Sequence, residues 1–241
     1  MSEQPANSND PDPVFEAIDL KKEFDEGNVK ALRGVNFKID PGEFVSIVGP
    51  SGSGKTTLLH MLGSLDLPSS GELKFKGTNL PDLPDYADYR AREVGFIFQS
   101  FHLLPTFTIR ENVQIPTFGL PGSARERKAR AVELLNAVGL SHRLDHLPSK
   151  LSGGERQRAA IARSMVNNPG VLLADEPTGN LDTENAAQIM ELLDLLQEEH
   201  KTTLILVTHD MDVASHASRE IRMLDGKIAS DSSKIPKPQS S

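Results

Sequence analysis

The residues best suited to chemistry in this chain lie in the stretch GPSGSGKTT, residues 49–57. The stretch fits the pattern G-x-x-x-x-G-K-[S/T], follows the apolar run EFVSIV and opens the helix-like segment KTTLLHMLG. Backbone N–H groups of such a loop converge on phosphate oxygens, helped by the positive end of the following helix. We therefore expect a nucleoside triphosphate to be held by Gly49, Pro50, Ser51, Gly52, Ser53, Gly54, Lys55, Thr56 and Thr57.

Two side chains of this loop have individual expected roles. Lys55 would reach the β- and γ-phosphates, and Thr56 would offer its hydroxyl to Mg²⁺. The alternative is a flexible Gly/Ser turn. A chance match in a chain of this length has a probability on the order of 1 in 100, and the strand and helix on either side lower it further.

A second candidate is VLLADE, residues 171–176, an apolar strand that ends in two carboxylates. The carboxyl end of a parallel strand meets the ligand crevice, so Asp175 would hold Mg²⁺, usually through water. Glu176, one residue further, would polarise the attacking water as a general base. Taken alone, an apolar run followed by Asp-Glu is more often a strand that enters an acidic loop. The catalytic interpretation of these two carboxylates therefore depends on the presence of the first motif.

The third candidate is LSGGERQR, residues 151–158, which opens a long helix with one serine and two glycines. A helix start without bulky side chains is a second anion-binding site, made here by Ser152, Gly153 and Gly154. One chain would then hold two phosphate-binding helix N-termini about a hundred residues apart. Simple ATP hydrolysis by a domain with a single phosphate-binding loop (P-loop), such as residues 49–57, needs only one such N-terminus.

The elements that must position these motifs indicate an α/β fold with a parallel sheet. Four continuous apolar runs are typical of parallel strands buried on both faces: EFVSIVG, VGFIFQ, VLLAD and TTLILVTH. More exposed, partly antiparallel strands are expected in FEAIDLKKEF, ALRGVNFKID and EIRMLDGKIASD. Helical spacing without strand signals predicts an inserted helical subdomain over about 100–169.

Composition places this domain among ordinary soluble globular chains. Of 241 residues, 37% are hydrophobic and 25% charged, and the absence of Cys excludes disulfides, cysteine zinc sites and thiol catalysis. No apolar run approaches the roughly 20 residues of a membrane span, so we expect the chain to be neither secreted nor membrane-spanning. The domain is expected over 14–231, with polar, disordered tails at 1–13 and 232–241.

The ordered motifs resemble the nucleotide-binding subunits of ATP-binding cassette (ABC) transporters, from Phe15 to Asp231. The set is GPSGSGKTT, Gln99 after VGFIF, LSGGERQR, VLLADEP, Asn180-Leu181-Asp182 and Thr208-His209-Asp210. The resemblance implies an ATPase that uses ATP and Mg²⁺ and forms a head-to-tail homodimer. In such a dimer the LSGGE segment of one copy closes over the ATP of the other. That arrangement explains the second anion-binding site.

The resemblance also implies roles for single residues. Gln99 would contact Mg²⁺ and the attacking water, His209 would touch the γ-phosphate, and Asp182 would lie in the dimer contact. Phe24 resembles the aromatic residue that stacks on adenine. Each has an ordinary alternative: a Gln after a strand is usually a solvated cap, a His beyond a strand end is usually a surface residue, and a strand-end Phe is more often core.

Within the family the chain looks most like the lipoprotein-releasing, macrolide-exporting and peptide-exporting ATPases, with Ser64 where that subgroup often has Cys. The resemblance implies separate integral membrane permease subunits and a place on the cytoplasmic face of the cell membrane. The contact would lie in SFHLLPTFTIRENV, which carries the apolar residues Phe101, Leu103, Leu104 and Phe107. The alternative is that these four residues are the core of the helical subdomain.

Two other functions remain open at this point. A non-transport ATPase that regulates cell-wall remodelling at division would carry nearly the same catalytic motifs. A soluble cassette ATPase acting on DNA or ribosomes is disfavoured, because such chains have fused or interrupted cassettes. The net charge of −8 also makes bulk attraction to nucleic acid unfavourable, and we expect no nucleic-acid partner.

Overall fold

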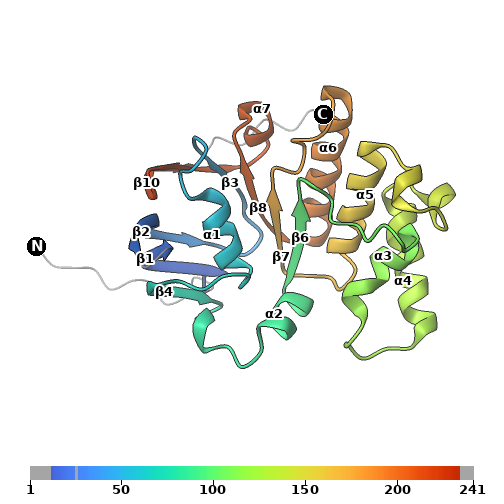
Figure 1. Cartoon of the computed structure of the whole chain (residues 1–241), viewed down its shortest axis with the longest axis horizontal. Helices are drawn as coiled ribbons and strands as arrows, with labels where there is room; N and C mark the ends of the chain where they lie inside the picture. The colour runs from blue at the N-terminus through green and yellow to red at the C-terminus, as the bar shows by residue number, and fades with distance from the viewer. Residues whose placement is uncertain (1–11, 25–26, 234–241) are drawn as a thin grey trace, which may run out of the picture.

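Two β-sheets and their covering helices form the structure, a computed structural model that describes residues 12–24 and 27–233 (Figure 1). The strands are β1 Phe15–Phe24, β2 Val29–Ile39, β3 Phe44–Val48, β4 Ser70–Phe75, β5 Thr78–Asn79, β6 Val94–Phe98, β7 Val171–Asp175, β8 Thr203–Thr208, β9 Arg219–Leu224 and β10 Lys227–Ser233. The α-helices are α1 Lys55–Leu62, α2 Tyr86–Arg92, α3 Ile109–Gln114, α4 Ala124–Ala137, α5 Gly153–Ser164, α6 Thr183–His200 and α7 Met211–Ala214. Short 3-10 helices are η2 Leu80–Asp82, η3 Ile115–Thr117, η4 Ser141–Arg143 and η5 Pro148–Lys150.

The larger sheet has the strand order β10-β9-β3-β8-β7-β6, and only the β9–β10 pair in it is antiparallel. Its parallel strands β3, β8, β7 and β6 are the four predicted from continuous apolar runs. Strands β3, β7 and β8 are buried on both faces, whereas β6 lies at the edge with Phe96 and Phe98 partly exposed. In β7, Val171 and Leu173 belong to one hydrophobic cluster, whereas Leu172 and Ala174 belong to another. The alternation follows from the two-residue period of a strand and places a core on each side of the sheet.

The smaller sheet, of order β2-β1-β4-β5, is antiparallel and packs with α1 against the first of these clusters. The predicted strands in FEAIDLKKEF and ALRGVNFKID are therefore confirmed, as is the β9–β10 hairpin around Asp225 and Gly226. Both turn residues have positive φ, 48° and 75°, as the preferred two-residue hairpin turn requires.

The end of the last strand differs from the sequence prediction. Ser232 and Ser233 pair with Glu220 and Arg219 of β9, so β10 continues two residues past the expected domain boundary at 231. The ladder supplies hydrogen-bond partners that the polar composition of this segment gave no reason to expect. The rest of the predicted tails, residues 1–11 and 234–241, lies outside the described residues.

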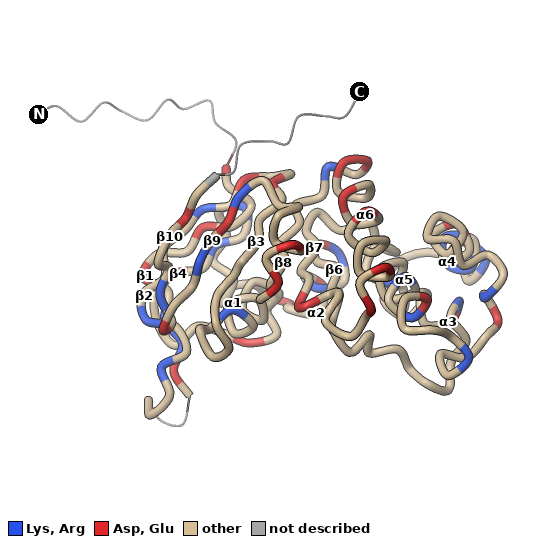
Figure 2. Tube along the Cα trace, turned by 90° about the horizontal axis from the view of Figure 1, so that it is seen from above, with Lys and Arg blue, Asp and Glu red and all other residues tan. Residues whose placement is uncertain are grey.

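The helical segment lies at the end of the molecule opposite the antiparallel sheet (Figures 1 and 2). No strand occurs between residues 99 and 170, all of which are described, as the sequence predicts. Helices α3, α4 and α5 each begin with a capping box, formed by Thr108, Ser123 and Ser152 with a glutamate three residues later. Each box satisfies two otherwise unpaired backbone donors and fixes where its helix starts.

Basic and acidic residues are interspersed along the described trace (Figure 2). The ion pair of Lys38 with Glu16 joins neighbouring strands, and Arg219 of β9 pairs with Glu43, which directly precedes β3. Among the described residues, no helix is both long enough and apolar enough to span a membrane.

Candidate functional site: a nucleotide cleft at the strand ends

Several of the predicted catalytic and metal-binding residues come together because four parallel strands end at the same edge of the sheet. Register pairs Val48 with Thr208, Asp175 with Val207, and Phe98 with Asp175. The P-loop, the LADE motif, Gln99 and His209 therefore all follow neighbouring strand ends, where ligands bind in open α/β sheets. The strand β8 lies between the P-loop strand and the acidic strand, although it comes last of the three in sequence.

The P-loop leads directly from β3 into α1. Gly54 caps the helix with φ of 100°, and a Cβ there would stand 2.5 Å from the carbonyl oxygen of Ala31. Both observations require glycine. Lys55 is 8% exposed, and its Nζ donates to the carbonyl oxygens of Gly49 at 2.8 Å and Pro50 at 3.0 Å. The ammonium group is thus held over the loop, where phosphate oxygens could replace the carbonyl acceptors.

A cavity of about 490 Å³ opens over this loop. Its lining joins the P-loop to Phe24 and to Glu176, and consists of Phe24, Val29, Lys30, Ala31, Ser51, Gly52, Gly54, Lys55, Thr56, Thr57 and Glu176. Phe24 is 40% exposed at the end of β1, with Nζ of Lys22 4.9 Å from its ring centroid. Its ring is therefore a surface for contact at the far end of the cavity and is not part of the core, which favours the expected stacking role over the core alternative.

Thr56 lines this cavity and contacts Asp175, which is not one of the lining residues. The Thr56 hydroxyl donates to Asp175 Oδ1 at 3.2 Å, although the two residues are 119 positions apart. Burial raises the pKa of Asp175, and the Thr56 hydrogen bond offsets part of that effect. A desolvated carboxylate beside a hydroxyl is a hard-oxygen set that suits Mg²⁺. The described residues contain no group of three His, Asp or Glu side chains placed to hold a metal ion together.

Glu176 turns away from the strand with φ of 47° and is held by the end of β8. Its carboxylate accepts from the Thr208 hydroxyl at 3.1 Å and from the His209 N–H at 3.1 Å, and lies 2.7 Å from His209 Nδ1. The hydrogen bond with Glu176 and its negative charge raise the pKa of His209. The structure thus brings the two residues together, with Glu176 also lining the P-loop cavity.

Gln99 is exposed and tied to the loop that follows Glu176. The backbone carbonyl oxygen of Gln99 accepts from Asn180 Nδ2 at 2.9 Å, and the side-chain Nε2 of Gln99 lies 3.4 Å from Asn180 Oδ1. A Cβ on Gly179 would stand 2.7 Å from Gln99 Nε2, so the small residue lets the two loops approach. Gln99 is therefore held against the loop at residues 179–180, and it is not among the residues that line the cavity over the P-loop.

The LSGGE segment lies at the start of α5 and packs against the start of α6. Asp182 caps α6, accepting from Asn185 N at 2.9 Å and Asn185 Nδ2 at 2.8 Å. The amide group of Asn185 lies so close that a Cβ on Gly154 would be 2.2 Å from its Oδ1. Gly154 is thus buried, and its lack of a side chain leaves the space that Asn185 occupies. Ser152 remains exposed.

Residues 32–179 match the sequence pattern of the family described as ABC transporter. The chain belongs to this family. It is 49% identical over 219 residues to an uncharacterized ABC transporter ATP-binding protein of Thermotoga maritima, covering 89% of this chain and 93% of the relative. The ABC transporter motifs named above are therefore those of an ATP-binding subunit.

Solved ABC cassettes share the whole fold. MJ0796, solved as a dimer in a post-hydrolysis state bound to ADP and Pi, superposes with a TM-score of 0.84 at 40% identity, covering 92% of this chain and all of that one. The protein cbiO1 from Clostridium perfringens, part of the ABC transporter complex cbiONQ, superposes with a TM-score of 0.83 at 28% identity. The match covers 92% of this chain and 89% of cbiO1. The predicted α/β cassette fold and the ATPase activity are confirmed.

The ABC signature is separated from the cleft of its own chain. The cavity over the P-loop is lined by none of the described residues 151–158. The expected second anion-binding site, residues 152–154, therefore does not line the cavity over the P-loop of the same chain. The sequence did not indicate Asn185 and Arg143, which contact Asp182 and Glu155, and it indicated Asn180 only within the Asn180-Leu181-Asp182 motif, not as a partner of Gln99. The spacing S-x-x-E, residues 152–155, was a signal for the cap that Glu155 forms, and no comparable signal pointed to Arg143.

Proposed function

We propose that this ABC ATPase drives lipoprotein release or macrolide or peptide export through separate membrane subunits, from the cytoplasmic face of the cell membrane. The observation that carries its dimeric part is the separation of the LSGGE helix from the P-loop cavity of its own chain, whereas the choice of lipoprotein release or export rests on the sequence resemblance to that subgroup. A second copy, related by a two-fold axis, would bring each signature onto the other's nucleotide. Support comes from MJ0796, which is dimeric in both solved structures.

The residues of the cleft divide the work of hydrolysis. Lys55 and the P-loop amides would bind the phosphates, and Thr56 and Asp175 would hold Mg²⁺, which supplies charge neutralisation when bound. Glu176, fixed by Thr208 and His209, would take the proton of the attacking water. His209 would touch the γ-phosphate, Gln99 would contact Mg²⁺ and the attacking water, and Asp182 would lie at the contact between copies.

The expected contact with a membrane subunit is supported by the exposure of part of the apolar segment after Gln99. Leu104 and Phe107 are 44% and 42% exposed, whereas Leu103 packs against the second hydrophobic cluster. Leu103 therefore belongs to the core, as the alternative expected, whereas Leu104 and Phe107 are the residues proposed to contact the membrane subunit. Exposed large apolar side chains that lie close together mark interaction sites.

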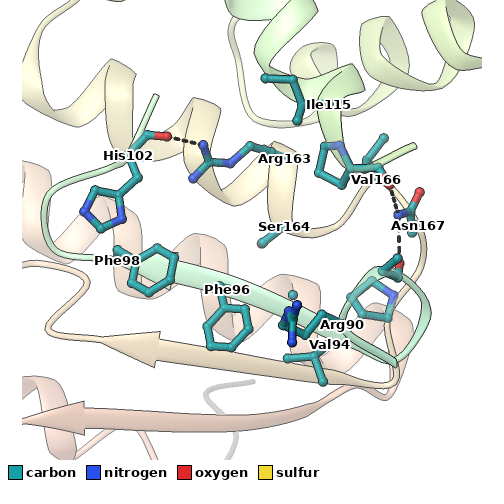
Figure 3. A pocket seen from close by; sticks show the side chains of 14 residues that line it. Arg90, Val94, Phe96, Phe98, His102, Ile115, Arg163, Ser164, Val166 and Asn167 are labelled. Atoms are coloured by element: carbon teal, nitrogen blue, oxygen red, sulfur yellow. Dashed lines mark hydrogen bonds between the residues drawn. The ribbon is translucent and has the colours of Figure 1, made fainter. Parts of the chain in front are cut away.

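A cavity of about 300 Å³ adjoins this segment, between β6, η3 and the end of α5 (Figure 3). Phe96, Phe98 and Ile115 line it together with Arg163, which donates to the carbonyl oxygen of His102 at 2.5 Å. A mostly apolar hollow that also has two arginines, Arg90 and Arg163, in its lining suits a short segment of a partner protein. Such a segment would rest on both the sheet domain and the helical segment.

The proposal is tested by capture of partners from detergent-solubilised membranes with tagged Glu176→Gln and ATP. We expect mass spectrometry to find a membrane protein with few spans and a large extracytoplasmic domain. Its identity separates lipoprotein release, export and control of cell-wall remodelling. Recovery of only soluble proteins or nucleic acid would leave the ATPase standing and contradict the transport role.

Surface variants locate the contact in the same experiment. Leu104→Glu with Phe107→Glu should abolish capture and leave ATP hydrolysis by the isolated chain unchanged. Leu195→Glu is the matched control, because Leu195 is 58% exposed on α6, away from this segment. If the Glu176→Gln parent, the Leu104→Glu/Phe107→Glu variant and the Leu195→Glu control all capture the partner equally, the membrane contact lies elsewhere.

A further inference from the structure

The signature helix carries an acidic residue where an anion should bind. Glu155 is the third residue of α5, and its Oε2 accepts from the Ser152 N–H at 2.8 Å. The Ser152 hydroxyl in turn accepts from the Glu155 N–H at 3.2 Å, which leaves its own O–H free to donate. A carboxylate in the first turn stabilises a helix, but it also offsets the positive potential that draws a phosphate to that end.

The carboxylate is paired from the loop between α4 and α5. Arg143 Nε donates to Glu155 Oε1 at 2.8 Å, and His142 Nε2 stands 3.7 Å from the same oxygen. The Glu155 side chain is 13% exposed and that of Arg143 is 32% exposed, so water screens this pair less than most surface ion pairs. The hydrogen bond from the Ser152 N–H, together with Arg143, lowers the pKa of Glu155 to about 2, so the charge persists throughout the neutral range.

We infer that Arg143 is a positioning residue that neutralises Glu155 and so keeps the signature able to receive the γ-phosphate of the partner's ATP. This inference rests on the proposed composite dimer. Without Arg143, an uncompensated carboxylate would face the triphosphate across the closing interface, and like charges brought together there disfavour association. Arg143 acts on the partner's nucleotide through Glu155 and has no part in the P-loop cavity of its own chain.

The test follows ATP-dependent dimerisation by sedimentation in a Glu176→Gln background, with and without Arg143→Ala and Glu155→Gln. Arg143→Ala should raise the protein concentration needed for half-maximal dimer by roughly fivefold. Glu155→Gln should change it by less than about twofold, since the amide oxygen can still accept from Ser152 N. The double variant should return to the value of Glu155→Gln, because removing the charge removes the need for its partner.

Two further readouts separate charge compensation from a structural role. The Arg143→Ala defect should shrink as salt rises, because salt screens the repulsion. Affinity of the dilute monomer for a fluorescent ATP analogue should stay unchanged. Arg92→Ala is the control, since Arg92 forms an exposed pair with Asp88 on α2.

The outcomes are distinct. A double variant as weak as Arg143→Ala, or an Arg143→Ala protein that dimerises normally, overturns the inference while the composite dimer stands. If the Glu176→Gln parent binds ATP and never dimerises, the composite site fails and this inference fails with it.

Discussion

Glu176 Oε1 and His209 Nδ1 lie 2.7 Å apart at the ends of two neighbouring parallel strands. The His209 backbone N–H also donates to the same oxygen at 3.1 Å. The proposed general base is therefore oriented by the end of β8, the strand next to its own. In this arrangement a side-chain change at His209 alters the position of the base, while the backbone hydrogen bond remains.

This contact predicts a pH-dependent contribution to stability. The pKa of His209 is raised above its ordinary 6.5 by Glu176, so the stabilisation is fully present below about 6.5 and is lost as pH rises through the raised value. His209 is largely exposed, so the difference in unfolding free energy between the wild type and His209→Gln should stay below about 1 kcal/mol. Urea unfolding from about pH 5.5 to about pH 9 should show that difference shrinking with pH. A difference independent of pH would contradict the pairing.

Phe24 provides a prediction about nucleotide binding. If its ring stacks on adenine, Phe24→Ala should weaken ATP binding by roughly tenfold, and Phe24→Tyr should bind nearly as the wild type does, because a base–aromatic stack contributes about 1–3 kcal/mol. Ile18→Ala is a matched control, being 41% exposed on the same strand and outside the cavity lining. Calorimetric titration with ATP measures all four proteins. Equal affinities for Phe24→Ala and Ile18→Ala would mean that adenine lies elsewhere.

The Thr56–Asp175 contact predicts which variants lose magnesium-dependent affinity. Thr56→Val and Asp175→Asn should each lower the affinity for ATP in Mg²⁺ by about tenfold or more and leave binding in EDTA nearly unchanged. Thr57→Val removes the neighbouring hydroxyl, which also lines the cavity, and should show a smaller magnesium effect. Equal losses with and without Mg²⁺ would assign the Thr56 hydroxyl to phosphate binding or to folding instead.

Replacing Gly154 by alanine should lower the stability of the fold for a steric reason. A methyl group there would meet Asn185 Oδ1 at 2.2 Å, so Gly154→Ala should reduce the free energy of unfolding by roughly 1–3 kcal/mol. Gly170→Ala is the control, because its nearest atoms to a new Cβ are side-chain ends at 3.8 and 3.9 Å. Chemical denaturation distinguishes them. Two glycine variants of equal stability would mean that Asn185 moves aside freely.

Local patterns were sufficient to predict the strands, the P-loop and the signature helix. The runs before Gly49, Gln99 and Glu176 are apolar because both faces of the sheet are buried, and that burial produced the continuous pattern seen in the sequence. Capping residues such as Ser152 likewise act over three positions, within reach of sequence analysis.

Contacts between distant segments could not be predicted in this way. The Thr56–Asp175 hydrogen bond spans 119 positions, and it depends on a strand order in which β8 separates β3 from β7. The positive φ of Glu176 and the approach of Asn185 to Gly154 depend on how the loops pack together. The continuation of β10 to Ser233 depends on pairing with β9, which composition does not encode.

Light scattering coupled to gel filtration of Glu176→Gln with MgATP tests the composite dimer most directly. Replacing the base should slow hydrolysis by a factor on the order of 10²–10⁴ while ATP still binds, so the closed state accumulates. The mass should then be twice the 26.3 kDa of one chain, and Lys55→Ala, which lacks the phosphate-binding ammonium group, should remain a monomer. A Glu176→Gln protein that binds ATP and still elutes at the mass of one chain would contradict the account.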